Sequence, residues 1–291
     1  MKPAAFTYHV PGTADAAVTL LAELGEEAKF IAGGQSLVPM LALRLAAFEH
    51  LIDLRAVAGL RGIEGRADSV WIGAATTHAD VGRSAEIRRR VPLLARATPL
   101  IGHFQIRNRG TIGGAIAHAD AAGEYPAVAL ALDAELEALS ARGRRVLPAS
   151  GFFTGMWSTA LAADELLTGM AFPVWAGRCG FAIEEFARRS GDFALAGAVV
   201  AVRLDADSRV DRCAVVVFGL GPTPVRATHT EAELLGREVT AVTAAEVGHS
   251  ATAELNSIPA DLHGSADYRR RLGAVMVARA WRRAAQEASD D

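Results

Sequence analysis

The sequence predicts an α+β fold with two domains. Its 291 residues and 51% hydrophobic composition are enough for roughly two domains with their own cores. Up to about residue 170, short apolar strands alternate with helical segments, which is typical of layered structures of helices and sheet. Beyond residue 180, longer runs of apolar and β-branched residues precede helical segments, which indicates an antiparallel sheet followed by helices.

The N-terminal half is expected to begin with a helix over residues 13–24, capped by Thr13 and closed by Gly25. A helix is expected to begin near residues 76–80, because Thr and Asp are good caps. Strands are expected at 29–32, 50–54, 70–74, 134–139 and 145–148, and a further helix at 92–97.

In the C-terminal half, the mixture of Pro, Gly and Trp at residues 173–180 marks the expected domain boundary. A turn at residues 205–208 is expected to join the last two of three strands. The three strands are expected at 181–188, 194–204 and 211–218, and helices at 230–235, 243–255 and 266–287.

A first candidate binding loop runs from Phe30 to Met40, where an apolar strand end passes through Gly33-Gly34 into an amphipathic helix. Adjacent glycines let the backbone turn sharply and let a ligand approach the main chain closely. Ser36 is a good helix cap, and bare amides at a helix start favour phosphate. The loop is therefore a candidate phosphate-binding turn.

A second glycine pair, Gly113-Gly114, also follows an apolar residue, 80 positions after the first. Either pair alone could be a chance turn in a chain with 28 glycines, but together they could hold a two-phosphate ligand from both sides. Neither loop has the Lys of a Walker loop, and no GxGxxG with a suitably placed acidic residue occurs. Nucleotide hydrolysis and a Rossmann site are thus disfavoured, whereas FAD bound in another fold remains open.

Composition excludes several other classes. A net charge of −3 without a long basic run gives no reason to expect nucleic acid or an anionic membrane as a partner. No apolar run has signal-peptide or membrane-spanning length, so we expect no transmembrane segment and a cytoplasmic location. The two cysteines, Cys179 and Cys213, cannot form a disulfide framework or supply the four usual thiolates of an iron–sulfur cluster. No motif predicts a catalytic residue or a metal ligand in this chain.

Several motifs together resemble the FAD-binding medium subunits of the molybdenum hydroxylases, such as the medium subunit of aerobic carbon monoxide dehydrogenase and the flavin domain of xanthine dehydrogenase. The resemblance runs in order along nearly the whole chain. The motifs are AGGQSLVPMLALRLA at 32–46 with LIDL at 51–54, RNRGTIGGAIAHADAAGEYPAVALALDA at 107–134, FFTG at 152–155 with TALAADELL at 159–167, and EEFARRSGDFALAG at 184–197.

The resemblance implies a two-part FAD-binding domain of the vanillyl-alcohol-oxidase/PCMH-like type over residues 1–176, with subdomains of about 1–56 and 57–176. It implies a smaller C-terminal domain over residues 177–291, built of a three-stranded antiparallel sheet with helices. The residues implied to bind FAD are Ala32, Gly33, Gly34, Gln35, Ser36, Leu37, Ile101, Thr111, Gly113, Gly114, Ala115, Asp120, Glu124, Leu167 and Phe193.

Some of these residues have an ordinary alternative role. Asp120 and Glu124 could be solvated acids, but the resemblance favours contacts with sugar hydroxyls. Ile101, otherwise a core residue, would lie over the flavin ring, and Phe193 would place an aromatic ring near it without the hydroxyl of a Tyr. Relatives often carry Lys where this chain has Glu185, so a contact to the flavin is in doubt there and the flavin could be harder to reduce.

By resemblance, the chain is the flavoprotein subunit of a dimer of heterotrimers. [2Fe-2S] clusters on a small subunit would deliver electrons to FAD after a molybdenum cofactor on a large subunit has hydroxylated the substrate. Oxygen, a quinone or another carrier would then accept them. Two alternatives remain open, a self-contained FAD oxidase or reductase and a nonenzymatic scaffold. On the leading hypothesis, Gly33→Val or Gly113→Val should strip flavin without unfolding the chain, because the added bulk would block the pyrophosphate.

Overall fold

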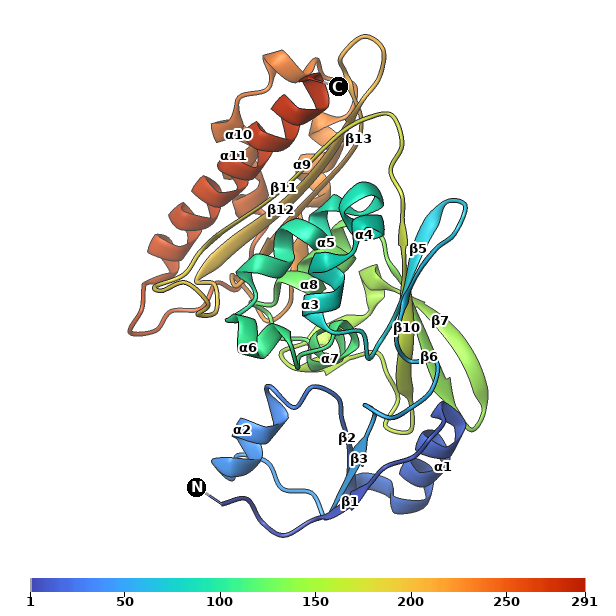
Figure 1. Cartoon of the computed structure of the whole chain (residues 1–291). Coiled ribbons are helices and arrows are strands. Elements are labelled where there is room, and N and C mark those ends of the chain that lie inside the picture. The colour runs from blue at the N-terminus through green and yellow to red at the C-terminus, as the bar shows by residue number, and fades with distance from the viewer. Residues whose placement is uncertain (1, 291) are drawn as a thin grey trace.

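The structure, a computed structural model, describes residues 2–290. Figure 1 shows an N-terminal lobe at the lower end, a middle region of helices beside a large sheet, and a C-terminal sheet backed by long helices at the upper end. Apart from a small parallel sheet at the N-terminus, the larger sheets are antiparallel and helices pack on them, which confirms the expected α+β class. Within residues 2–290, every helix falls short of the length or apolarity that crossing a bilayer would need.

The N-terminal lobe consists of β1 (Thr7–His9), α1 (Ala14–Leu24), η1 (Gly25–Glu27), β2 (Ala28–Ile31), α2 (Leu37–Ala42) and β3 (His50–Asp53). Its strands form a parallel sheet in the order β1-β3-β2. The predicted cap of α1 is confirmed, because the Thr13 side chain accepts a hydrogen bond from the Ala16 amide at 3.1 Å. Helix α2 is short, and Arg44 turns the chain just beyond it with a φ of 57°.

The middle region contains a five-stranded antiparallel sheet in the order β4-β5-β10-β6-β7 and a layer of short helices. The predicted hairpin at residues 134–148 is present. Thr77 caps the helix that is predicted to begin near residues 76–80. The elements are β4 (Ile63–Gly65), β5 (Ser69–Gly73), α3 (His78–Arg83), α4 (Ala85–Arg90), α5 (Pro92–Ala97), η2 (Thr98–Leu100), α6 (Phe104–Arg107), α7 (Ile112–His118), α8 (Glu124–Ala131), β6 (Glu135–Ser140), β7 (Gly143–Pro148), η3 (Ala149–Gly151), β8 (Phe153–Gly155), β9 (Ser158–Thr159) and β10 (Leu166–Pro173).

The C-terminal region consists of β11 (Arg178–Phe186), β12 (Ala196–Leu204), β13 (Val210–Phe218), β14 (Val225–Arg226), α9 (Thr228–Leu234), η4 (Val239–Ala241), α10 (Ala244–Ala253) and α11 (Ala266–Asp290). The three predicted strands are present. The prediction of a three-stranded sheet is nevertheless wrong, because β14 pairs with β13 as a fourth strand. Two residues after a turn-rich segment are too few to show a strand period.

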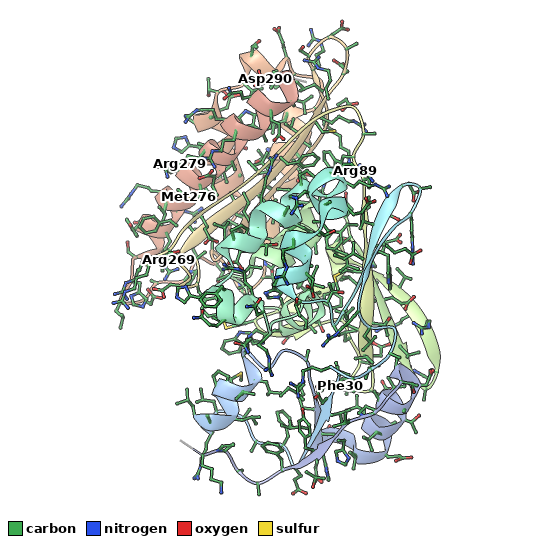
Figure 2. All side chains as sticks on the ribbon, in the orientation of Figure 1. Phe30, Arg89, Arg269, Met276, Arg279 and Asp290 are labelled. Carbon is green, nitrogen blue, oxygen red and sulfur yellow. The ribbon has the colours of Figure 1, made fainter. Side chains whose placement is uncertain are left out.

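The C-terminal sheet lies between two layers of helices. Helices α10 and α11 cover one face, and along α11, on which Figure 2 labels Met276 and Arg279, Met276 is buried and Arg279 is exposed. Helices α5 and α8 of the middle region pack on the other face. Residues 125–131 of α8 are buried without exception, as expected for a helix that is apolar all round.

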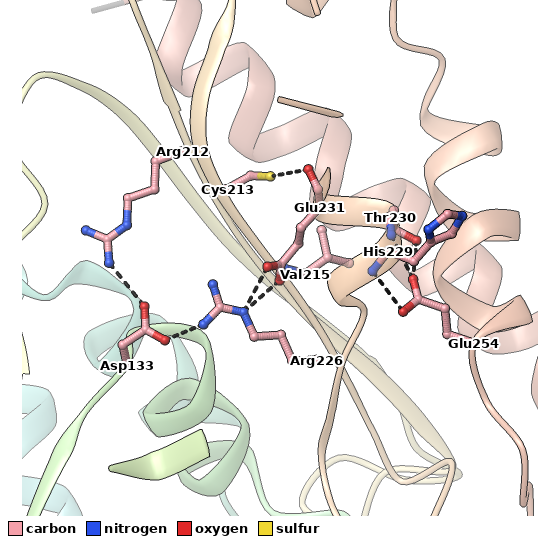
Figure 3. Close-up of polar contacts among 9 residues, drawn as sticks. All are labelled: Asp133, Arg212, Cys213, Val215, Arg226, His229, Thr230, Glu231 and Glu254. Carbon is pink, nitrogen blue, oxygen red and sulfur yellow. Dashed lines mark hydrogen bonds and ion pairs between the residues drawn. The ribbon is translucent and has the colours of Figure 1, made fainter. Parts of the chain in front are cut away.

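Polar contacts also join the middle region to the C-terminal sheet (Figure 3). Asp133, just after α8, accepts hydrogen bonds from Arg212 of β13 at 3.1 Å and from Arg226 of β14. The Arg226 Nε atom donates to both carboxylate oxygens of Glu231 at 2.9 Å. These contacts run from the end of α8 through β14 to α9.

Candidate cofactor-binding site

One cavity of about 740 Å³ lies between the N-terminal lobe and the middle region and reaches the loop after β11. Cofactor sites typically occupy about 300–1,000 Å³. Phe30, labelled in Figure 2, belongs to the wall contributed by the N-terminal lobe. All fifteen residues that the resemblance implies for FAD binding line this cavity: Ala32, Gly33, Gly34, Gln35, Ser36, Leu37, Ile101, Thr111, Gly113, Gly114, Ala115, Asp120, Glu124, Leu167 and Phe193.

The two glycine loops, far apart in sequence, are in direct contact along this cavity. A Cβ atom built on Gly33 would lie 2.2 Å from the Arg109 carbonyl oxygen and 2.6 Å from the Gly110 Cα atom. A Cβ atom on Gly114 would lie 3.5 Å from the Ala32 side chain. The fold therefore brings together the two loops that the sequence singles out.

These contacts correct the expected effect of the valine substitutions. A Cβ atom on Gly113 would lie 2.4 Å from the Ala74 Cβ atom and 2.6 Å from its carbonyl oxygen, just as one on Gly33 would meet the backbone of Arg109. The added bulk would first collide with protein and not with a ligand. The prediction that Gly33→Val or Gly113→Val leaves the fold intact is therefore wrong, because both glycines permit backbone segments to pack closely.

The loops differ in the amides that they offer to a ligand. In the second loop, the Gly113 amide donates to the Ala74 carbonyl oxygen at 2.9 Å, and the Gly114 amide donates to the Thr111 hydroxyl at 3.1 Å. Among the hydrogen bonds of residues 2–290, none uses a backbone amide of residues 33–36 as its donor, although the Gln35 side-chain amide donates to the Gly33 carbonyl oxygen at 3.1 Å. Bare amides suited to phosphate thus lie on the first loop, while those of Gly113 and Gly114 are already engaged.

Ser36 departs from its predicted role. It precedes α2, but its backbone is already in the right-handed helical region, with φ −101° and ψ −48°, and its side chain makes no capping hydrogen bond. Ser36 lines the cavity without capping the helix. Thr111 does act as a cap, at the start of α7.

The two acidic residues lie at the cavity, although not on one helix face as their spacing suggests. Ala119 ends α7 with a left-handed φ of 52°, so Asp120 lies in a turn and Glu124 begins α8. Burial raises the pKa of Glu124 to about 8, and the negative charges of Glu185 and Asp120 add to this increase. Glu124 is therefore neutral at pH 7 and can donate a hydrogen bond as well as accept one.

The apolar residues of the site come from three elements. Leu167 of β10 is buried in the core, Ile101 is half-buried after η2, and Phe193 is 69% exposed. The Arg107 guanidinium fixes the Ile101 loop by donating to the carbonyl oxygens of Ile101 at 2.9 Å and Gly102 at 2.7 Å. These side chains could cover a flat ring at the end of the cavity nearest the C-terminal sheet.

Glu185 lies on β11 at the same side of the molecule. Burial raises the pKa of its carboxyl to about 7. Among the described residues, its Oε2 atom is buried without a hydrogen-bond partner. Within the described residues, Glu185 is thus a half-buried acid without an ion-pair partner.

The cavity is also lined by three further residues that the motifs did not identify. His118 and Trp157 have nearly parallel rings with centroids 6.4 Å apart, and the Trp157 indole donates to Asp120 at 3.3 Å. Trp157 has an unusual φ of 54° in the β8–β9 turn. His78 is buried beside the second loop. Neither a lone His after a helix cap nor a Trp in a hairpin carries a sequence signal for binding.

The geometry defines a class of protein. Free amides on one loop suit phosphate, the polar groups of Asp120 and Glu124 suit sugar hydroxyls, and apolar side chains suit a flat ring. Such an arrangement fits an extended dinucleotide with an aromatic head group.

Comparisons with known proteins agree with this class. The family described as the FAD binding domain in molybdopterin dehydrogenase matches residues 4–175, and the CO dehydrogenase flavoprotein C-terminal domain matches residues 181–284. The chain therefore belongs to the molybdopterin dehydrogenase FAD-binding family.

Relatives match over almost their full length. The carbon monoxide dehydrogenase medium chain of Hydrogenophaga pseudoflava is 41% identical to this chain, and the match covers 96% of this chain and 97% of the relative. The alpha subunit of the 6-hydroxypseudooxynicotine dehydrogenase complex of Paenarthrobacter nicotinovorans is 40% identical to this chain. That match covers 96% of this chain and 94% of the relative. A solved structure of the H. pseudoflava carbon monoxide dehydrogenase that lacks the Mo-pyranopterin moiety matches with a TM-score of 0.95 and 40% identity over 99% of both chains.

Proposed function

We propose that this chain is the FAD-carrying electron-transfer subunit of a molybdenum hydroxylase. The observation that carries this proposal is the contact between two glycine loops on a cavity that all fifteen implied FAD-binding residues line. When bound, FAD accepts electrons from iron–sulfur clusters and passes them to an external acceptor such as oxygen, a quinone or another carrier. The chain itself binds, orients and shields the cofactor.

The residues divide by the part of FAD that they would contact. The free amides of residues 33–36 would hold the pyrophosphate, and Ala32, Leu37, Thr111, Gly113, Gly114 and Ala115 would form the wall around it. Asp120 and Glu124 would bind hydroxyls of the sugar or ribityl chain. Ile101, Leu167 and Phe193 would pack against the ring system.

The iron–sulfur clusters and the molybdenum cofactor would be carried by partner subunits. The only two cysteines are both buried and too few for the usual cluster ligation. Relatives of almost equal identity are named as parts of larger enzymes, one as the medium chain of a carbon monoxide dehydrogenase and one as a subunit of a dehydrogenase complex. We therefore infer a small iron–sulfur subunit and a large molybdenum subunit, assembled as a dimer of heterotrimers in the cytoplasm.

The substrate is expected to be set by the large subunit. The two relatives are named for unlike substrates, carbon monoxide and 6-hydroxypseudooxynicotine, yet they are 41% and 40% identical to this chain. Similarity in the flavoprotein subunit thus does not follow the substrate.

We also propose a division into a FAD-binding domain of residues 1–176 and a C-terminal domain of residues 177–291. The ends of the two family matches, at 175 and 181, support this boundary. The proposed subdomains, about 1–56 and 57–176, fall on either side of the cavity.

The test is to purify the chain gently, alone and with its copurifying partners. The chain should contain about one FAD, released intact on denaturation, and substrate should bleach the flavin absorbance only when both partners are present. A single chain that turned over a small substrate unaided would instead indicate a self-contained oxidase or reductase. A colourless preparation that failed to take up added FAD would indicate a scaffold.

A further inference from the structure

His78 is a buried polar side chain whose two ring nitrogens lack partners. Its exposed fraction is 5%, and among the described residues neither Nδ1 nor Nε2 has a hydrogen-bond partner. The ring lines the 740 Å³ cavity. Leaving a buried donor unsatisfied typically costs stability, so a buried imidazole of this kind indicates a partner that the protein chain does not supply.

The backbone places this imidazole beside the second glycine loop. The His78 amide donates to the Gly110 carbonyl oxygen at 2.9 Å, and the Ile112 amide donates to the Thr76 carbonyl oxygen at 3.0 Å. A Cβ atom on Gly110 would lie 3.0 Å from the His78 Cε1 atom and 3.2 Å from Nδ1. Gly110 therefore leaves the edge of the ring uncrowded, and a ligand lying along this loop would pass His78.

The ring is neutral and can donate a hydrogen bond. Burial lowers the pKa of His78 to about 4 and the Arg107 charge lowers it further, while a weak interaction with the Thr111 backbone, outside normal hydrogen-bond geometry, raises it. A neutral imidazole has one N–H donor and one acceptor nitrogen. The neighbouring Tyr125 ring meets His78 edge to face at 5.0 Å, but its hydroxyl is already bonded to Thr98 at 2.8 Å. The protein therefore leaves the imidazole donor for a bound molecule.

The second loop needs such a donor because its own amides are engaged. Gly113 and Gly114 donate to Ala74 and Thr111, while the amides of the first loop are free. We propose that His78 is a cofactor-binding residue that donates a hydrogen bond to an oxygen in the phosphate–ribityl portion of bound FAD. This inference rests on the proposed function and adds to it a polar contact that the motifs do not contain.

The test compares FAD binding and stability in two variants of the full chain after flavin removal. His78→Phe keeps an aromatic ring but removes both nitrogens, so FAD affinity should fall about tenfold, equivalent to about 1.4 kcal/mol. The FAD-free variant should be as stable as the wild type or more so, because two unsatisfied polar atoms are replaced by apolar ones. His78→Gln keeps an N–H donor and should recover part of the affinity. His249→Gln, at an exposed site on α10, is the control and should bind as the wild type does.

A second measurement does not depend on the variants folding. In the wild type labelled with ¹⁵N-histidine, FAD should shift the His78 ring N–H resonance and slow its exchange with water. Unchanged FAD affinity in His78→Phe, or a His78 resonance indifferent to FAD, would overturn the inference. If the wild type bound FAD normally in either case, the proposed function would stand; failure of the wild type to bind FAD would remove both.

Discussion

Gly33 shows why a glycine in a binding loop need not be there for the ligand. We expect Gly33→Ala to lower the free energy of unfolding of the FAD-free chain by about 2 kcal/mol, since its Cβ would lie 2.2 Å from the Arg109 carbonyl oxygen. Chemical denaturation of FAD-free protein measures this effect. Gly12→Ala is the matched control, because a Cβ there meets nothing within 4 Å and should change stability by less than about 0.5 kcal/mol. Equal stability of the two variants would contradict the close packing of the loops.

The raised pKa of Glu124 predicts the direction in which the free energy of unfolding changes with pH. The folded chain holds this proton up to about pH 8, whereas an unfolded chain releases it near the ordinary value of 4.5. The carboxyl therefore contributes stability that is present below about pH 4.5 and is lost progressively as pH rises toward 8. Glu124→Gln cannot ionise, so its stability relative to the wild type should improve by about 4 kcal/mol between pH 4.5 and 8.5.

Unfolding of the FAD-free wild type and variant at these two pH values provides the measurement. Glu185, whose raised pKa also produces a decline with pH, is present in both proteins, so the comparison reports Glu124 together with its coupling to Glu185. Parallel stability profiles for the two proteins would show that Glu124 ionises normally in the fold.

Sequence motifs pointed to cavity residues in and beyond the glycine loops but not to His78 and Trp157. Gly33 and Gly113 are recognisable because a glycine pair after an apolar strand end is a local signal. His78 and Trp157 reach the same cavity only through long-range contacts, such as the bond from the Trp157 indole to Asp120. Neither the engagement of the Gly113 amide nor the burial of His78 can be deduced from neighbours in the sequence.

Among the elements, the long helices and many of the strands were predictable, whereas α8 and the central strand β10 of the middle sheet were not. Alternation and turn residues indicate the β6–β7 hairpin and the strands β11 to β13. Residues 125–131 show no polar face, so they carry no helical period, and only their burial between the sheet and α5 explains the helix. The strand β14 escaped notice because it has two residues and depends on pairing with β13.

The members of the ion-pair network between α8 and β14 should contribute unequally to the free energy of unfolding. Glu231 is buried, accepts the Val215 amide at 2.8 Å and pairs with the Arg226 Nε atom, so Glu231→Ala would leave that Nε and a buried amide without partners, although Asp133 would still bind the guanidinium. We expect this variant to lose about 3 kcal/mol of unfolding free energy. Asp133→Ala removes a partner that is 42% exposed and should cost less than about 1 kcal/mol. Urea titrations of both variants measure the contrast, and equal losses would contradict the difference in burial.

For the whole molecule, the structure indicates that the two proposed domains do not fold independently. One apolar cluster includes Tyr125 and Val128 of α8 together with Val199, Val216 and Phe218 of the C-terminal sheet. Helix α8 has no polar face to turn toward water once that sheet is removed. The proposed boundary therefore marks a change of architecture that one apolar cluster crosses, while a second cluster lies wholly in the C-terminal region.

A fragment of residues 1–176 should therefore be unstable and poor at binding FAD. It would expose the apolar surface of α8 and would lack the loop at 191–193, which supplies the Phe193 wall of the cavity. We expect such a fragment to bind an apolar dye, aggregate at concentrations at which the full chain stays in solution, and take up little FAD. Adding residues 177–291 as a separate chain should restore both solubility and FAD uptake, because the buried face would be covered again. A monomeric fragment that bound FAD as tightly as the full chain would show instead that the cofactor site and its core are complete without the C-terminal sheet.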